Sequence, residues 1–397
     1  MDKEKLLQES TSMQSKLVED RRWLHCHPGT GFDIGDTIEY VTKELTAMGY
    51  EVHPCGKAGL TVLAGGKKPG KVFMIRGDMD ALPFKEESGE PFAAQNGKMH
   101  ACGHDMHTTM MLGAARLLKA HEDEICGTVK LDFQPAEEIF EGAEDMLEDG
   151  LLENPKVDAA MMMHVAAGIP LPTGTVLISK GGVSCSAADF FTIHVQGKGC
   201  HGSTPNNGVD PITVASHIII ALQEISAREL ALSDRAVLTI GSIHGGAAGN
   251  AIPDTVDMVG TIRTYDEDTR AFMKKRLTEI SAGIAASFRA QADVRFTSGC
   301  PTLKNDPALS ESYTRYMGEL LPGKSRSLGD MMASGSEDFA YVSQKVPSIM
   351  LSLAAGEPKD GHTHSLHQPK VTFDENCLSV GSAVYAYGAM RWLEDNQ

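Results

Sequence analysis

A short segment from Met99 to His107 (MHACGHDMH) gathers side chains that could hold a metal ion. Cys102 and His104 are separated by one glycine, and Asp105 follows directly. Thiolate and imidazole groups are typical ligands of zinc and of its neighbours in the first transition row. An isolated Cys-x-His pair is more often an ordinary turn, so the interpretation depends on donor groups elsewhere in the chain.

Further donor groups occur downstream, at the adjacent Glu137 and Glu138, at His164 and in a group of three histidines, His362, His364 and His367. One of two adjacent carboxylates can stay on a cation while its neighbour takes a proton from a polarised water. The alternative for the glutamates is a solvated helix start, because acidic residues continue after them. The alternative for His164 is a buried, hydrogen-bonded histidine.

The elements that would position these residues alternate between strands and helices. Apolar runs predict strands at residues 61–64, 71–76, 129–133 and 159–163, and helices are expected at 1–23, 36–48 and 106–121. This order indicates a mostly parallel sheet flanked by helices, whose ligands bind beyond the carboxyl ends of the strands. Asp78 and Asp80, the two glutamates and His164 all follow such ends, so we expect them to meet in one site.

The pattern changes near residue 185. The next elements are a strand at 190–195, a helix at 210–230, strands at 236–243 and 256–264, a helix at 268–288 and a strand at 292–297. The order βαββαβ is that of an α+β ferredoxin-like domain. We therefore predict an inserted domain at 185–297 and a catalytic metal-binding domain made of 1–184 and 298–397. A helix at 305–321, a strand at 349–353 and a helix at 375–393 would return His367 to that catalytic domain.

Composition narrows the class of protein. The 397 residues include 53 acidic and 36 basic ones, for a net charge of −17, which argues against binding to nucleic acid or to an anionic membrane. No run of 18 apolar residues occurs, the first residues lack the layout of a secretory leader, and the eight cysteines are scattered. We expect a cytoplasmic protein that acts on a small molecule.

Taken together, the motifs resemble the amidohydrolase branch of the dinuclear aminoacylase and carboxypeptidase metallopeptidase family. Its members include hippurate hydrolases, N-acyl-amino-acid amidohydrolases and plant hydrolases of indoleacetyl-amino-acid conjugates. The matching segments are RGDMDALP at 76–83, HACGHDMH at 100–107, QPAEE at 134–138, GCHGSTP at 199–205, GNAIPD at 249–254, GTIR at 260–263, GSEDF at 335–339 and HQP at 367–369. The resemblance implies an α/β catalytic domain with an inserted lid or dimerisation domain.

Carried over residue by residue, the resemblance implies five metal ligands: Cys102, His104, Glu138, His164 and His367. Glu137 would be the general base, and His201 of the inserted domain would stabilise the developing oxyanion, usually from the partner subunit of a dimer. Asn250 and Arg263 would hold a carbonyl and a carboxylate of the substrate, and Asp78 and Asp80 would orient the ligands. Five ligands of mixed softness are too many for one tetrahedral zinc, so we expect two divalent ions, zinc or manganese, with cobalt or nickel also admitted.

Three positions depart from the family pattern. Gly29 stands where a glutamate is usual, Cys200 where a glycine is usual, and Asn206 where a histidine is common. These positions concern the substrate more than the reaction.

We predict a metal-dependent hydrolase that cleaves N-acyl amino acids into a carboxylic acid and a free amino acid. A dipeptidase or aminopeptidase using the same two ions is the alternative. A metal-binding protein without catalysis is disfavoured by Glu137. A zinc nucleobase deaminase is excluded, because no H-x-E with a later P-C-x-x-C is present.

Overall fold

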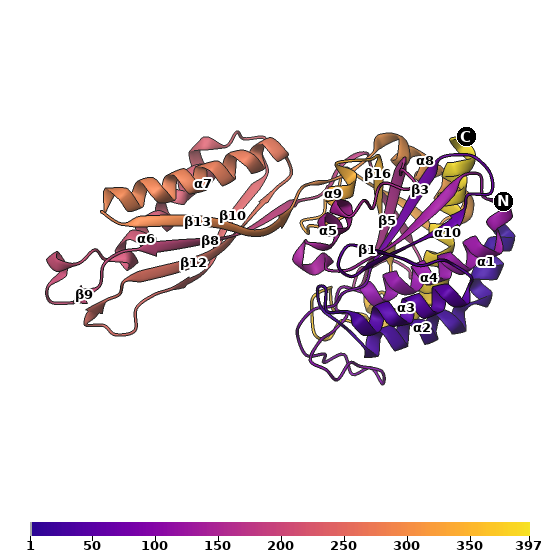
Figure 1. The fold of residues 1–397 in the computed structure, drawn as a ribbon, viewed down its shortest axis with the longest axis horizontal. Coiled ribbons are helices and arrows are strands. Elements are labelled where there is room, and N and C mark those ends of the chain that lie inside the picture. Colours follow the sequence, from indigo (N-terminus) through magenta and orange to yellow (C-terminus); the bar gives the residue numbers. More distant parts are fainter. Residues whose placement is uncertain (1) are drawn as a thin grey trace. The chain divides into compact units, whose positions relative to one another are not determined.

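The structure is a computed structural model that describes residues 2–397. The chain divides into two compact units (Figure 1). Unit 1 comprises residues 2–184, 304–332 and 338–397, and unit 2 comprises 185–303 and 333–337. The short segment 333–337, predicted to belong with the catalytic domain, is thus grouped with unit 2.

Unit 1 is built on an eight-stranded sheet in the order β1-β2-β4-β3-β5-β16-β6-β15. The strands β3, β4, β5 and β16 at its centre run parallel, whereas β1, β2 and β6 make antiparallel pairs. The mostly parallel α/β fold is thereby confirmed. The strands are β1 His53–Cys55, β2 Gly59–Gly65, β3 Val72–Asp78, β4 Thr128–Gln134, β5 Ala159–Ala166, β6 Val176–Ser179, β15 Ser325–Gly329 and β16 Ser348–Ala354.

The predicted helices of unit 1 begin and end close to where the sequence pattern places them, with one exception, and the short helices α5 and α9 were not predicted. The single helix expected at 1–23 is two helices, α1 and α2, which meet at Met13. The helices are α1 Lys3–Ser12, α2 Gln14–Cys26, α3 Gly35–Ala47, α4 His104–Ala120, α5 Gly142–Glu148, α8 Pro307–Leu320, α9 Ala340–Ser343 and α10 Leu378–Asp395.

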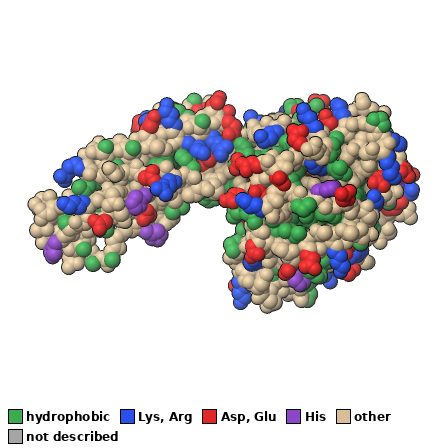
Figure 2. Space-filling model, viewed as in Figure 1, with side chains coloured by type: hydrophobic (Ala, Val, Ile, Leu, Met, Phe, Trp, Pro, Cys, Tyr) green, Lys and Arg blue, Asp and Glu red, His purple; other side chains and the backbone are tan. Residues whose placement is uncertain are grey.

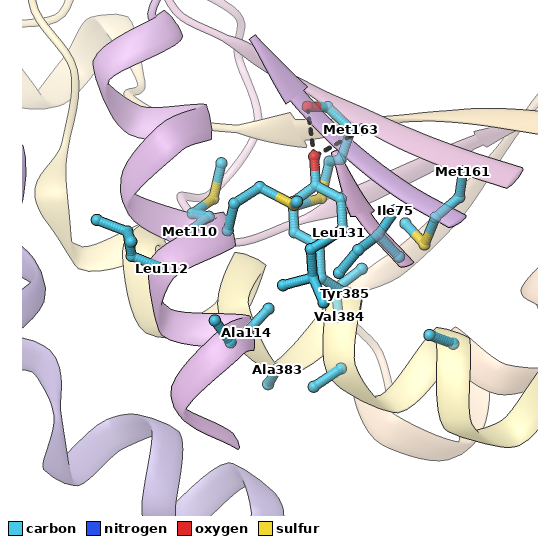
Figure 3. Packing of buried hydrophobic residues seen from close by; sticks show 14 of the residues in the cluster. Ile75, Met110, Leu112, Ala114, Leu131, Met161, Met163, Ala383, Val384 and Tyr385 are labelled. Carbon is cyan, nitrogen blue, oxygen red and sulfur yellow. Dashed lines mark hydrogen bonds between the residues drawn. The ribbon is translucent and has the colours of Figure 1, made fainter. Parts of the chain in front are cut away.

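The core of unit 1 lies where α4 and α10 pack on the central strands (Figure 3). Met110 and Ala114 of α4 and Val384 of α10 point toward Ile75 of β3 and Leu131 of β4. Nearly every residue of α4 from His104 to Leu118 is buried, so this helix is enclosed on all sides rather than amphipathic. Residues at its first turn are therefore held by packing as well as by hydrogen bonds.

Unit 2 has a four-stranded antiparallel sheet in the order β10-β12-β8-β13. This order and the βαββαβ sequence of elements are those of the ferredoxin-like plan. Helices α6 and α7 bury Phe191, Ile193 and Met258 beneath them. The elements are β8 Ala187–Gln196, β9 Cys200–His201, α6 Pro211–Glu224 with a π-turn at Ile225–Glu229, β10 Ala236–His244, β11 Ala251–Ile252, β12 Thr255–Thr264, α7 Glu267–Ser287 and β13 Gln291–Cys300.

The chain passes between the units at β7 (Gly182–Cys185) and β14 (Leu303–Asn305), and again on either side of the segment 333–337. Within the described residues, no helix is both long enough and apolar enough to cross a bilayer. On the face drawn in Figure 2, Lys and Arg side chains are interspersed with Asp and Glu.

Candidate metal centre

A glycine turns the chain between Cys102 and His104, at the point where α4 begins. Gly103 has φ +85°, and a Cβ built on it would lie 2.3 Å from Cγ2 of Val165. Only glycine meets both conditions, the left-handed backbone and the lack of space. The turn places Cys102 just before the helix and His104 at its first residue, and both side chains are buried.

The donor atoms of the five predicted ligands form two groups that share Cys102. One group is Cys102, His104 and His164, and the other is Cys102, Glu138 and His367; within each group the atoms lie within 4.8 Å of one another. The Sγ atom of Cys102 is 3.4 Å from Nε2 of His164 and 3.2 Å from Nε2 of His367. The geometry thus offers two neighbouring cation positions with one sulfur between them.

Two buried atoms of this cluster, Nε2 of His104 and Oε1 of Glu138, have no hydrogen-bond partner among the described residues. Burial of a polar atom without a partner costs free energy, which a cation at that point would offset. Burial, together with the carboxylates of Glu138 and Glu137, raises the pKa of the Cys102 thiol well above its usual value. A divalent cation would counter that effect, because a coordinating thiol is deprotonated. The residues present therefore fit a pair of divalent metal ions.

Asp80 orients His104 and the loop of the two glutamates. The Nδ1–H of His104 donates to the backbone carbonyl of Asp80 at 2.9 Å, which leaves Nε2 as the nitrogen that a cation can bind by displacing its proton. The Asp80 carboxylate accepts the backbone N–H groups of Glu137 at 3.0 Å and Glu138 at 3.2 Å. Burial raises the pKa of Asp80. For His104 burial acts the other way, but the carboxylates of Asp78 and Asp80 prevail and raise its pKa to about 10.

Glu137 and Glu138 lie on a single 3₁₀ turn, Glu137–Ile139, that begins three residues after the end of β4. The residues on either side of the turn, Ala136 (φ +56°) and Phe140 (φ +58°), have left-handed backbones although neither is glycine. Such conformations are unfavourable and tend to occur at functional sites. They aim both carboxylates at His104, whose Nε2 lies 3.9 Å from Oε2 of Glu137 and 3.8 Å from Oε1 of Glu138.

Both carboxylate oxygens of Asp78 are hydrogen-bonded to other side chains. Its Oδ2 accepts a hydrogen bond from Nη1 of Arg76 at 2.7 Å, and its Oδ1 lies 2.6 Å from Nδ1 of His107. Burial opposes ionisation, but His104, Arg76 and His107 hold the pKa of Asp78 well below its usual range. Nη2 of Arg76 donates to Asp338 at 2.9 Å. The sequence motifs contain Arg76, His107 and Asp338, but sequence reasoning assigned them no role.

His164 lies inside β5, which continues to Ala166, so the prediction that it follows the end of a strand is wrong. Its Nδ1 donates to the carbonyl of Val165 at 2.7 Å, so Nε2 is the nitrogen available to a cation. His367 is 53% exposed at its side chain and has φ +61°. Its backbone N–H donates to the carbonyl of Ala101 at 3.0 Å, which brings this late segment beside Cys102.

In unit 2, His201 and Asn250 lie beside each other. The two-residue strands β9 and β11 pair His201 with Ala251, and the N–H of Gly202 donates to the Asn250 carbonyl at 2.8 Å. The backbone N–H of Ser203 donates to Nδ1 of His201 at 3.1 Å, so a neutral His201 carries its proton on Nε2. Both side chains are exposed. His201 can therefore present Nε2–H as a donor.

Arg263 lies near the other end of β12. Its guanidinium stacks over the ring of Phe190, with 5.3 Å from Cζ to the ring centroid, and Nη1 lies 3.4 Å from Oγ of Ser336. Within residues 2–397, no carboxylate is within ion-pair distance of it. Burial lowers the pKa of Arg263, which is half-buried. A partly desolvated guanidinium without an anion is suited to receive the carboxylate of a ligand.

The three departures from the family pattern have different surroundings. A Cβ at Gly29 would lie 2.3 Å from the carbonyl oxygen of Asp33, so a larger residue would not fit this loop as it stands. The Sγ of Cys200 lies 3.5 Å from the Thr204 carbonyl, and Asn206 is exposed.

Comparison with known proteins links the whole chain to one group of enzymes. The model of peptidase family M20/M25/M40 matches residues 74–391. An N-acetyl-L-cysteine deacetylase of Bacillus subtilis is 36% identical over 389 residues, which cover 98% of this chain and 90% of that protein. The IAA-amino acid hydrolase ILR1-like 2 of Arabidopsis thaliana is 34% identical, with 96% and 85% covered. Thermostable carboxypeptidase 1 of Saccharolobus solfataricus is 33% identical, with 98% of each chain covered.

Two solved structures share the fold at 33% identity. One is a putative aminohydrolase from methicillin-resistant Staphylococcus aureus, with a TM-score of 0.90 over 99% of this chain and 100% of that one. The other is a dinuclear metal-binding peptidase of the M20 family from Bacillus subtilis, with a TM-score of 0.80 over 97% and 99%.

Proposed function

This chain belongs to peptidase family M20/M25/M40 and is a metal-dependent hydrolase, and on that premise we propose that it cleaves the amide bond of N-acyl amino acids. The products would be a carboxylic acid and a free amino acid. The observation that carries the proposal is the pair of donor groups that share Cys102, with the Glu137 carboxylate beside them.

Cys102, His104, Glu138, His164 and His367 would hold two divalent ions. When bound, the ions supply a Lewis acid that polarises the scissile carbonyl and the attacking water. His104 and His164 are suited to this because each donates Nδ1–H to a backbone carbonyl and thereby keeps Nε2 for a metal.

Glu137 is the proposed general base. Its Oε2 is 3.9 Å from Nε2 of His104, and Glu137 belongs to neither of the two donor groups that share Cys102. It would take a proton from the attacking water and deliver it to the amine nitrogen as the C–N bond breaks. One water is consumed, and its hydroxyl goes to the acyl carbon while its proton goes to the departing amino acid.

The groups of unit 2 would act on the rest of the substrate. His201 would donate Nε2–H to the oxyanion, Asn250 would bind a carbonyl, and Arg263 would pair with the free α-carboxylate. A guanidinium binds a carboxylate through two parallel hydrogen bonds, which favours acids over esters and amides.

The positions of these groups within unit 2 support a dimer. In the sheet, Thr255 of β12 pairs with Gln196, whereas Arg263 pairs with Ala188 at the opposite end. Eight strand residues span roughly 27 Å, since each residue rises about 3.4 Å. Asn250 comes shortly before Thr255 in the chain, and His201 comes shortly after Gln196, so both lie beyond this end of the sheet. A small N-acyl amino acid held by Arg263 is therefore out of reach of the same unit's His201. We infer that His201 and Asn250 serve the site of a second copy.

A second candidate is a peptidase, because relatives named carboxypeptidases match the chain along 98% of its length. The test compares acetyl-, benzoyl- and longer acyl-amino acids with dipeptides and blocked dipeptides. The purified chain is first stripped with a chelator and then reloaded with zinc, manganese, cobalt or nickel. Turnover of acyl-amino acids well above that of dipeptides supports the proposal. Preference for a free amino terminus would overturn it in favour of a dipeptidase.

A further inference from the structure

The central strands β3 and β5 separate just before the metal centre. Their parallel pairing ends at Arg76 and Met162, while β5 continues to Ala166 with β16 alone as its partner. Backbone N–H groups of β5 beyond Met162 therefore need partners other than β3. This stretch contains His164.

The first of these backbone N–H groups, that of Met163, is hydrogen-bonded by a side chain of α10. The N–H of Met163 donates to Oη of Tyr385 at 3.0 Å (Figure 3). That hydroxyl also lies 2.9 Å from the carbonyl oxygen of Arg76. The Tyr385 hydroxyl thus bridges the two strands at the point where they separate.

The second of these backbone N–H groups, that of Val165, is hydrogen-bonded by a side chain of α4. The N–H of Val165 donates to Nε2 of His107 at 2.8 Å. Because Nε2 accepts, Nδ1 carries the proton and donates to Asp78 at 2.6 Å. His107 is completely buried and lies three residues after His104, so it faces the same side of the helix.

The next contact leads from Val165 to the ligand itself. The carbonyl of Val165 accepts Nδ1–H of His164 at 2.7 Å, while its N–H is held by His107. The rings of His107 and His164 also meet edge to face, with centroids 4.6 Å apart. The same residue, Val165, therefore connects the imidazole of His107 to the orientation of the His164 imidazole.

We propose that His107 is a positioning residue for His164: by accepting the N–H of Val165 it fixes the end of β5 and so aims Nε2 of His164 at the ion position that it would share with Cys102 and His104. The inference rests on the proposed metal centre and extends it. Both ring nitrogens of His107 are engaged with protein groups, so it acts through Val165 and not as a ligand.

Two substitutions of His107 distinguish the loss of its hydrogen-bond acceptor for the Val165 N–H from the loss of the rest of the imidazole. In His107→Gln the amide oxygen reaches about as far as Nε2 and can still accept the Val165 N–H. In His107→Asn the shorter amide can keep the contact with Asp78 but loses the one with Val165. His121→Asn is the matched control, since His121 caps the other end of α4, is also buried, and also has partners at both nitrogens, Glu124 and Glu9.

The metal-free proteins are titrated with Co²⁺, and binding is monitored through the thiolate-to-cobalt absorption and the d–d bands. The melting temperatures of the metal-free forms are measured in parallel. We expect His107→Asn to bind one of two ions about 10–100-fold more weakly with altered d–d bands, the usual effect of losing a group that orients a ligand. His107→Gln should stay within about threefold of the wild type, and His121→Asn should bind both ions normally.

If the Asn and Gln variants lost Co²⁺ affinity equally, or if both kept wild-type affinity, the proposed role of His107 as acceptor of the Val165 N–H would be overturned. If the Asn variant does not fold, a tenfold loss in the Gln variant still contradicts the proposal. A wild-type chain that binds no second ion would refute the dinuclear centre instead, so the two failures can be told apart.

Discussion

The two units hold their functional groups in opposite ways. In unit 1, His104 is buried, and the nitrogen of its ring that faces away from the ion positions is bonded to the backbone of Asp80. In unit 2, His201 is exposed, and within residues 2–397 its ring is hydrogen-bonded only to Ser203, two residues along the chain. The His104 ring is thus held by a residue far away in sequence, and the His201 ring by a neighbour in its own loop.

This difference indicates where each set acts. Apart from the half-exposed His367, the proposed ligands are largely buried and held by other parts of unit 1, so they can bind cations with little rearrangement. An exposed histidine on a short ribbon has no such constraint from its own unit. We therefore expect unit 1 to determine metal binding and proton transfer, and unit 2 to complete the site only when a second copy supplies His201.

The largest effect is expected at the adjacent glutamates. Glu137→Gln should keep both ions and lower kcat by about 10²–10⁴-fold, because general-base help is worth about that much. Glu138→Gln should instead lose metal. Metal analysis and steady-state kinetics on the same preparations check this. Similar behaviour of the two variants in both measurements would show that the roles are assigned wrongly.

The next effect concerns His201. His201→Ala should lower kcat by about 10²–10³-fold, as the loss of an oxyanion donor does, with the metal content unchanged. Mixed with Glu137→Gln chains under exchange conditions, it should regain activity, because some mixed dimers then contain one intact site. The control is His194→Ala, which changes a partly exposed histidine of β8 that is paired with Asp257, and this variant should stay active. A fully exchanged mixture that remains inactive would contradict action in trans.

A smaller loss is expected for Arg263. Hydrogen bonds to a charged group are worth about 1.5–3 kcal/mol, so Arg263→Ala should reduce kcat/KM by roughly 10–150-fold, mainly through KM. The methyl ester of the same substrate should react poorly with the wild type, and the gap between acid and ester should shrink in the variant. Arg295→Ala, at an exposed position of β13, is the control. Equal kcat/KM for acid and ester in the wild type would remove this role.

The smallest effect is expected from a substitution at Asp132, which should change the stability of unit 1 and leave that of unit 2 unchanged. Asp132 of β4 is buried, neither of its carboxylate oxygens is hydrogen-bonded to any residue of the described part of the chain, and burial raises its pKa to about 7. A carboxyl whose pKa is raised in the folded state contributes stability below about pH 4 and loses it as the pH rises to 7. Asp132→Asn should therefore stabilise unit 1 above pH 7, by at most about 4 kcal/mol since one pKa unit corresponds to about 1.4 kcal/mol.

Calorimetry at pH 5 and pH 8 checks this prediction. The transition of unit 1 should rise in the variant at pH 8 more than at pH 5, and a transition of unit 2 should not move. A larger gain at pH 5 would contradict the raised pKa of Asp132.

Much of the fold followed from local pattern. The main strands and helices of both units were predicted in their order, and the family and the α/β plus ferredoxin-like fold are confirmed. The short elements β1, β6, β15, α5 and α9 of unit 1 were not predicted. Hydrophobic periodicity and motif spacing are local properties, so they can be read without coordinates. The candidate ligands were named for the same reason, because Cys102, Glu138 and His367 lie in recognisable segments. Their roles, like those of His201, Asn250 and Arg263, stay predictions.

Other features depended on the tertiary structure alone. The separation of β3 from β5 places His107 against Val165, and Arg76 meets Asp338 across 262 positions of sequence. His164 proved to be inside a strand because the pairing with β16 continues after the pairing with β3 has ended. Hydrogen bonds between residues so far apart in sequence leave no trace in local periodicity. The amino-acid sequence by itself thus determined which groups could do the chemistry, and only the packing of α4 and α10 on the sheet decided which neighbours hold them in place.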